Sequence, residues 1–143
     1  MNYRFATPDD VPLIAAMNEQ LTRDENHRNR MTIPALRARM TKWLAEGSRA
    51  VLFEDDGEVV GYVLFDKTPE HVYLKHFFIE DAHRRKGAGR TAMEWLMANV
   101  WNDERRVRLD VLTGNERGIA FWKSLGFESY CITMEWECAD RVG

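Results

Sequence analysis

The residues best suited to chemistry in this chain surround two closely spaced glycines, Gly87 and Gly89. They follow an apolar segment and precede residues 93–101, whose apolar positions repeat at helical spacing. The first turn of a helix has unpaired N–H groups and a partial positive charge, and glycines let a bulky anion approach the backbone closely. Basic side chains surround the same place: Arg84, Arg85, Lys86 and Arg90. The combination predicts a pyrophosphate site at the start of a helix.

Other phosphate-binding patterns are absent from the sequence. Neither Gly-x-x-x-x-Gly-Lys-[Ser/Thr] nor Gly-x-Gly-x-x-Gly occurs. An alternative interpretation stays open, in which the basic residues are a solvated helix start and the glycines serve only packing.

Two segments resemble the GNAT N-acetyltransferase family. Residues 84–89 match the family pattern [Arg/Gln]-x-x-Gly-x-[Gly/Ala], and residues 115–127 are similar to its Asn-x-x-Ala-x-x-[Phe/Leu]-Tyr-x-x-x-Gly-Phe segment. With their flanking strands they span residues 72–136, whereas the first half of the chain agrees only in the order of its elements.

The resemblance implies an α/β fold. It would have a central mixed, mostly antiparallel sheet of about 6–7 strands, flanked by about four helices and splayed between the fourth and fifth strands. We expect one acetyltransferase-like domain over residues 1–143, with acetyl-CoA as co-substrate and no metal. The implied cofactor-binding residues are Phe77, Phe78, Ile79, Arg84, Arg85, Lys86, Gly87, Ala88, Gly89, Arg90, Asn115 and Trp122.

Two catalytic residues of the family pattern have no counterpart here. Trp122 stands where many members have a tyrosine that protonates the leaving thiolate, and Tyr73 stands where histone-modifying members have a glutamate. A thiol pKa of about 8.5 makes the thiolate a tolerable leaving group without a donor. The remaining candidates are Tyr130 as acid and Glu25 or His76 as base, and each is also compatible with a packing or surface role.

The sequence also predicts the elements around this site. Helices are expected from Thr7 and Thr32, each of which can act as an N-cap. A hairpin is expected around residues 55–58, a strand over 72–79 with alternating faces and another over 107–111. Asn115 can cap a short helix, and a last strand is expected over residues 130–136.

Composition narrows the range of partners. The 143 residues carry a net charge of −3 with a pI near 5.8, which does not favour nucleic acid, and no apolar run approaches a membrane span. Without a signal-peptide core the protein is expected to be cytoplasmic, with Cys131 and Cys138 reduced. Many family members are dimers, so a homodimer stays open.

These observations together predict the function. The acetyl group of acetyl-CoA would move directly from the thioester to a primary amine of a small molecule or a protein. The alternatives are a non-catalytic acyl-CoA-binding sensor or regulatory module, and a protein-interaction domain in which the glycine turn is only structural.

Overall fold

The computed structural model describes residues 1–28 and 30–138, so position 29 and the last five residues of the expected 1–143 domain lie outside the description. Contacts divide the chain into two compact units, Met1–Leu112 and Thr113–Gly143. Within the first unit the strands are β1 (Asn2–Phe5), β2 (Arg49–Asp55), β3 (Glu58–Lys67), β4 (Val72–Ile79) and β5 (Val107–Leu109). Its helices are α1 (Val11–Asp24), α2 (Ile33–Ala45), α3 (Asp81–Arg84) and α4 (Ala88–Asn99), with a 3₁₀ turn over Pro8–Asp10.

The strands form one mixed sheet in sequential order, β1-β2-β3-β4-β5. The first four are antiparallel to their neighbours, and β5 runs parallel to β4. The described residues therefore contain five strands rather than the expected 6–7, and α1–α5 make five helices rather than about four.

The expected last strand over residues 130–136 is the main correction. This segment forms no strand, and the side chains of Tyr130, Ile132, Met134 and Trp136 are exposed. Alternation predicts which side chains share a face, but a strand also needs a neighbouring edge that supplies hydrogen bonds, and no spacing rule specifies that edge.

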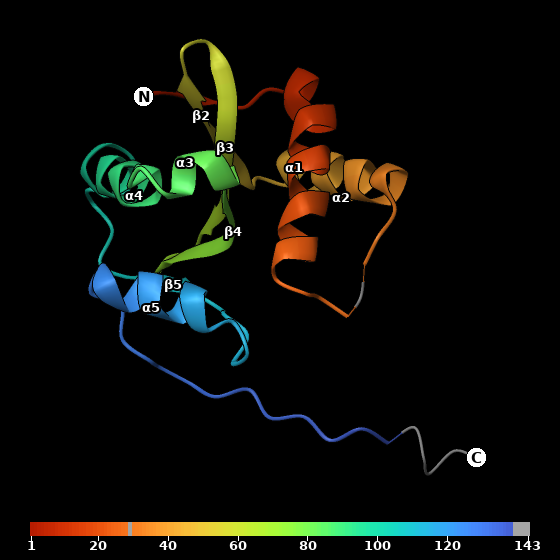
Figure 1. Ribbon diagram of the computed structural model, residues 1–143, viewed down its shortest axis with the longest axis vertical. Helices are drawn as coiled ribbons and strands as arrows, with labels where there is room; N and C mark the ends of the chain where they lie inside the picture. The colour runs from red at the N-terminus through yellow and green to blue at the C-terminus, as the bar shows by residue number, and fades with distance from the viewer. Residues whose placement is uncertain (29, 139–143) are drawn as a thin grey trace. The chain divides into compact units, whose positions relative to one another are not determined.

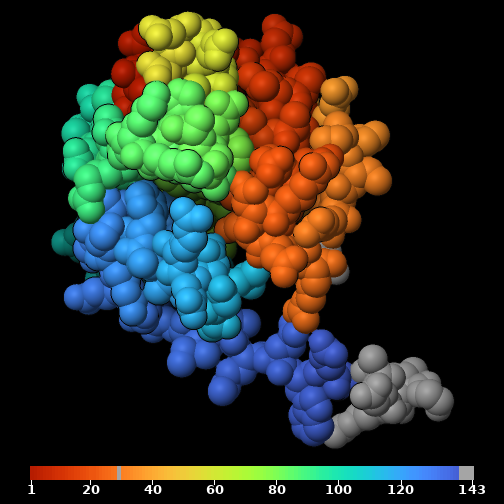
Figure 2. Space-filling model, viewed as in Figure 1, coloured from red at the N-terminus to blue at the C-terminus, as the bar shows by residue number. Residues whose placement is uncertain are grey.

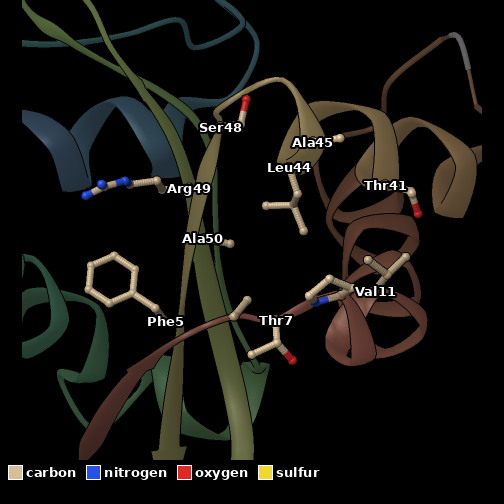
Figure 3. Close-up of a pocket in the computed structure, with 11 residues that line it drawn as sticks. Phe5, Thr7, Val11, Thr41, Leu44, Ala45, Ser48, Arg49 and Ala50 are labelled. Carbon is tan, nitrogen blue, oxygen red and sulfur yellow. The ribbon is translucent and has the colours of Figure 1, made fainter.

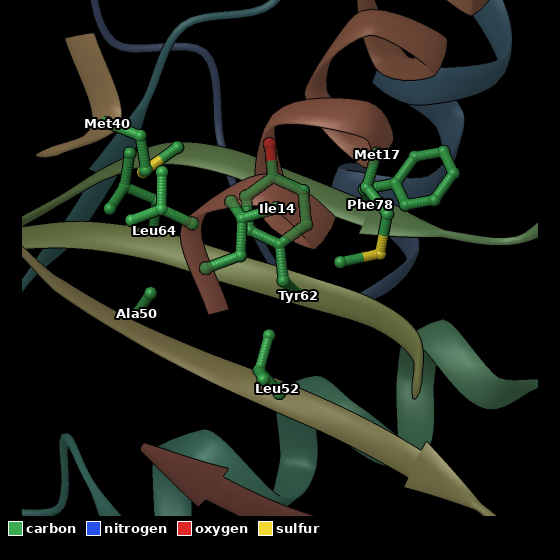
Figure 4. Close-up of a cluster of buried hydrophobic side chains, with 9 residues drawn as sticks. Ile14, Met17, Met40, Ala50, Leu52, Tyr62, Leu64 and Phe78 are labelled. Atoms are coloured by element: carbon green, nitrogen blue, oxygen red, sulfur yellow. The ribbon is translucent and has the colours of Figure 1, made fainter. Parts of the chain in front are cut away.

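The first unit has three layers, with α1 and α2 on one face of the sheet and α4 on the other (Figure 1). Figure 4 shows the core between the sheet and the helices α1 and α2. Its members are Val11, Ile14, Met17, Met40, Ala50, Leu52, Tyr62, Leu64 and Phe78. Alternation directs Val51 and Phe53 to the opposite face, and α4 contributes buried Ala92, Met93 and Leu96.

Local sequence explains most boundaries. Asp56 and Gly57 have φ of 51° and 80°, which turns β2 into β3 as the hairpin signal predicted. The Thr32 hydroxyl accepts a hydrogen bond from Ala35 N at 3.3 Å and caps α2. At the start of α1, Thr7 opens the 3₁₀ turn instead of the α-helix, and its N–H donates to Asp10 Oδ2 at 2.8 Å.

The second unit contains α5 (Glu116–Ser124). Asn115 caps it, since its Oδ1 accepts a hydrogen bond from Gly118 N at 2.9 Å, and Gly126 with φ 103° follows its end. Trp122 packs between aromatic rings, with its centroid 4.9 Å from Phe121 and 5.3 Å from Phe127. Across the described parts of both units, no helix has the length and apolarity needed to cross a membrane.

Candidate active site

A β-bulge shapes the middle of β4. Leu64 pairs with His76 and the next residue of β3, Phe65, pairs with Leu74, which leaves Lys75 as an extra residue in β4. The strict alternation expected for residues 72–79 is therefore wrong at this point. Lys75 and His76 both turn toward Trp43 of α2, with Lys75 Nζ 4.1 Å and the His76 ring 5.6 Å from the Trp43 ring centroid.

The same stretch of β4 is where its pairing with β5 ends. The parallel ladder runs from Val72, paired with Val107, to Leu74, paired with Leu109. Beyond Leu74 this edge of β4 is not covered by β5. The end of this ladder coincides with the bulge and with the position at which the expected splay would begin.

The glycine turn follows β4 after the short helix α3. Gly87 lies in the left-handed region with φ 75°, and no heavy atom lies within 4 Å of the place where a Cβ would stand. Helix α4 begins at Ala88, so the N–H groups of its first turn lack acceptors within the helix. Arg85 is exposed beside them. An open backbone, a helix start and a nearby cation fit a pyrophosphate group.

Arg84 is already engaged within the protein. Its Nε donates to the carbonyl oxygen of Ile79 at 2.6 Å, and its Nη2 donates to Asp24 Oδ2 at 2.5 Å. Arg84 therefore ties the end of β4 and the C-terminal end of α1 to the glycine turn, and these segments adjoin on the face seen in Figure 2. Burial opposes ionisation of Asp24, but hydrogen bonds from Arg84 and Gln20 outweigh it and lower the pKa of this carboxyl.

The two base candidates differ in environment. His76 is packed inside the first unit, with its Nδ1 3.1 Å from the Tyr62 hydroxyl. Burial, followed by the charges of Arg39 and Lys75, lowers the pKa of His76 to about 3. A neutral imidazole with so low a pKa is a weak proton acceptor near neutral pH.

Glu25 directly follows the last residue of α1. Burial raises its pKa above the ordinary value, against the opposing effect of His27, whose Nε2 lies 3.5 Å from Glu25 Oε1. The turn that places this pair is held by a hydrogen bond from His27 N to the carbonyl oxygen of Thr22 at 3.0 Å. A carboxylate with a raised pKa is a stronger base than an ordinary one, so the directions of the two pKa shifts favour Glu25 over His76.

The other predicted residues have well-defined structural roles or lie in the second unit. Tyr73 donates to Asp110 Oδ2 at 2.5 Å, and burial, followed by this bond, raises its pKa to about 12. Asn115, Trp122 and Tyr130 belong to the unit 113–143, where Asn115 caps α5 and Tyr130 is exposed. Among the described residues no group of three or more His, Cys, Asp or Glu is arranged to hold a metal ion.

A pocket of about 300 Å³ lies elsewhere in the first unit (Figure 3). It lies between the starts of α1 and β2 and the end of α2. None of the predicted site residues lines it. Its lining residues are Phe5, Ala6, Thr7, Pro8, Val11, Thr41, Leu44, Ala45, Ser48, Arg49 and Ala50.

A family model for the acetyltransferase (GNAT) family matches residues 14–127. No curated protein matches the chain. Among solved structures, a mutant of the BH1408 protein from Bacillus halodurans is 24% identical, covers 96% of this chain and 99% of its own, and has a TM-score of 0.79. A predicted acetyltransferase with acetyl-CoA from Clostridium acetobutylicum is 16% identical, with 97% of both chains covered and a TM-score of 0.74.

The aminoglycoside N-acetyltransferase AAC(6')-Iy in complex with CoA is 16% identical over 95% of this chain and 93% of its own, with a TM-score of 0.74. These likenesses establish the class of fold, an α/β acetyltransferase architecture with a mixed sheet. Because the family model spans most of the sequence, the chain belongs to the GNAT acetyltransferase family.

Proposed function

We propose that this protein transfers an acetyl group from acetyl-CoA directly to a primary amine, and that residues 1–143 act as one acetyltransferase domain. One observation carries the proposal: the edge of β4 that β5 leaves uncovered beyond Leu74 is followed, after the short helix α3, by a glycine turn whose backbone is open at Gly87. A strand edge and an open helix start in sequence suit the two parts of a CoA molecule, an extended amide chain and a pyrophosphate.

The residues that would hold CoA follow from this arrangement. Backbone groups of Phe77, Phe78 and Ile79 would face the pantetheine chain, and the N–H groups of residues 85–90 would face the pyrophosphate. Arg85, Lys86 and Arg90 would add positive charge. Arg84 would act mainly by positioning, because its guanidinium holds the carbonyl of Ile79 and the carboxylate of Asp24. Asn115 and Trp122 stay proposed cofactor residues on the family pattern.

When bound, acetyl-CoA supplies an activated thioester: the C–N bond to the acceptor forms, the C–S bond breaks, and the electron pair leaves on sulfur. The chain itself has to remove a proton from the amine. A lysine-like amine with a pKa near 10.4 is mostly protonated at neutral pH, and releasing its proton costs about 4 kcal/mol. Glu25 is the proposed base, because burial raises its pKa.

Protonation of the thiolate is a smaller requirement, since its pKa of about 8.5 lies near neutral pH. Tyr130 remains a proposed donor on the sequence pattern alone. The substitution of tyrosine by Trp122 is therefore compatible with catalysis, with solvent as the proton source.

A second function has a specific observation in its favour. Tyr73 is bonded to Asp110 and His76 has a pKa of about 3, so neither is a ready proton acceptor. The same fold could bind acyl-CoA as a sensor without transferring the acetyl group.

The experiment has two stages. Calorimetric titration with acetyl-CoA, CoA and ATP in parallel tests the cofactor, and micromolar binding of the first two with much weaker ATP binding is expected. Thiol release is then followed with a panel of polyamines, aminoglycosides, amino acids and peptides.

Thiol release that depends on the amine supports the transferase. Binding with only slow, amine-independent thioester hydrolysis supports the sensor instead. Absence of CoA binding overturns both, because the glycine turn would then be structural only.

A further inference from the structure

Arg39 is a half-buried cation on the α2 side of the sheet. It lies on α2 with its Cζ 4.5 Å from the centroid of the Trp43 ring. Its Nη2 donates to Asn18 Oδ1 at 3.1 Å. Among residues 1–28 and 30–138, no carboxylate lies within ion-pair distance of Arg39.

The neighbouring lysine is different in this respect. Lys75 also contacts the Trp43 ring, but its Nζ lies 3.0 Å from Asp66 Oδ2. Asp66 also accepts a hydrogen bond from the Ser48 hydroxyl at 2.5 Å. The charge of Lys75 is thus compensated within the protein, whereas the described residues offer no such compensation to Arg39. Burial of this guanidinium lowers its pKa.

A second donor beside Arg39 is unsatisfied. Asn18 is 1% exposed, and its amide nitrogen Nδ2 is buried without a hydrogen-bond partner in the described part of the chain. The Asn18 amide cannot simply be flipped, because its oxygen accepts a hydrogen bond from Arg39. A flip would place the NH₂ group against the N–H groups of Arg39, donor facing donor. A buried donor without a partner is costly. A group with oxygen acceptors would complement the charge of Arg39 and the free N–H of Asn18 at this place.

The place adjoins the proposed site of reaction. The Tyr62 hydroxyl lies 3.1 Å from His76 on the bulged part of β4. The pKa of Tyr62 is raised by burial, with the charge of Arg39 opposing the rise and that of Glu25 adding to it. The positive charge of Arg39 and the negative charge of Glu25 therefore both act on the Tyr62 hydroxyl.

We propose that Arg39 binds a carboxylate of the acceptor, so that the acceptor class is a small amino acid rather than a polyamine or an aminoglycoside. This inference rests on the proposed transferase function. A guanidinium fork matches the two oxygens of a carboxylate, and its face remains stacked on Trp43. The acceptor amine would then lie toward Glu25 and the acceptor carboxylate at Arg39.

The test compares acceptors in which the carboxylate is present with those in which a neutral amide replaces it, at equal concentrations of the unprotonated amine. Initial rates of CoA release are measured for the common L-amino acids and for the corresponding amino-acid amides. The same series is run on Arg39→Gln and on Arg37→Gln. Arg37 is an exposed arginine on the same helix and serves as the control.

We expect amino acids to exceed their amides by at least 10-fold in kcat/KM for the wild type and for Arg37→Gln. In Arg39→Gln this preference should fall to about 1, while rates with the amides stay within about threefold and the Kd for acetyl-CoA is unchanged. Equal rates for acids and amides in the wild type, or a preference that survives Arg39→Gln, would overturn the inference but leave the transferase intact.

A binding measurement keeps the inference testable if no acceptor reacts. The CoA-loaded protein, or the protein alone if CoA does not bind, is titrated with the same amino acids and amides while the side-chain NMR signals of Arg39 and Asn18 are followed. Shifts caused by at least one acid and not by its amide support the carboxylate site. Identical responses to both, or no response to any acid, overturn it.

Discussion

Replacement of Gly87 by valine offers the sharpest test of the proposed pyrophosphate site. Gly87 has φ 75°, a conformation that costs an L-residue with a Cβ about 1–2 kcal/mol, and β-branched residues adopt it least readily. Within the protein there is room for the side chain, because no heavy atom lies within 4 Å of the Cβ position. The free energy of unfolding should therefore fall by about 1–2 kcal/mol, which lowers Tm by roughly 3–10 °C.

Binding should suffer more than stability. A valine at this position projects from the turn, and strain in the turn misaligns the N–H groups at the start of α4. A hydrogen bond to a charged group contributes about 1.5–3 kcal/mol, and each 1.4 kcal/mol is a factor of ten. Loss of a single N–H contact to the pyrophosphate thus weakens the Kd for CoA by about 10- to 150-fold.

Gly47 supplies a matched control. It follows α2, has φ 107° and also has nothing within 4 Å of its Cβ position. Gly47→Val should lower Tm by at least as much, because φ 107° lies further from the left-handed region, and should leave CoA affinity unchanged. The assays are calorimetric titration with CoA and thermal unfolding by circular dichroism. A folded Gly87→Val protein with wild-type affinity would refute the placement of the pyrophosphate, and an equal loss in Gly47→Val would attribute the effect to general destabilisation.

Three further outcomes are expected. Glu25→Gln should lower kcat/KM at pH 7 by about 100-fold or more and remove the acidic limb of the pH–rate profile. Because burial raises the pKa of Glu25, the acidic limb of the wild-type profile should lie above the ordinary glutamate range. A pH–rate profile unchanged by the substitution would exclude Glu25 as the base. Hydrogen bonds from Arg4 lower the pKa of Asp10 in the folded protein. The Asp10 carboxylate therefore stabilises the fold above its unfolded pKa, and this stabilisation is lost as pH falls through its folded pKa. Asp10→Asn should lower Tm by a few degrees at pH 7 and much less near pH 2, and a loss of equal size at both pH values would contradict this. Asn115→Ala should destabilise α5 by about 0.5–2 kcal/mol, as measured by amide hydrogen exchange, whereas Asn115→Asp should retain the helix cap. Loss of CoA affinity in Asn115→Asp would indicate that Asn115 has a cofactor role beyond capping.

Much of the fold could be predicted from local patterns. The strand over residues 72–79 has the bounds that its apolar run indicated, and the hairpin turn at Gly57 and the cap at Thr32 form as their residue types require. In each case the deciding interaction lies within a few residues of sequence, so spacing alone suffices. The segment 130–136 has the same kind of pattern and forms no strand, since pairing depends on a partner edge elsewhere in the chain.

The sequence by itself determined the family and the glycine turn. A turn of fixed conformation needs glycine at a fixed position, and such a short motif can be recognised from the sequence alone. Only the tertiary structure decided what the charged side chains do. It engages Arg84 with Ile79 and Asp24, lowers the pKa of His76 to about 3, and leaves Arg39 beside Asn18 without a carboxylate partner among the described residues. The burial and the charge environment of each side chain depend on groups that are distant in sequence. The bulge at Lys75 also breaks the strict alternation of side chains that the sequence predicts for β4.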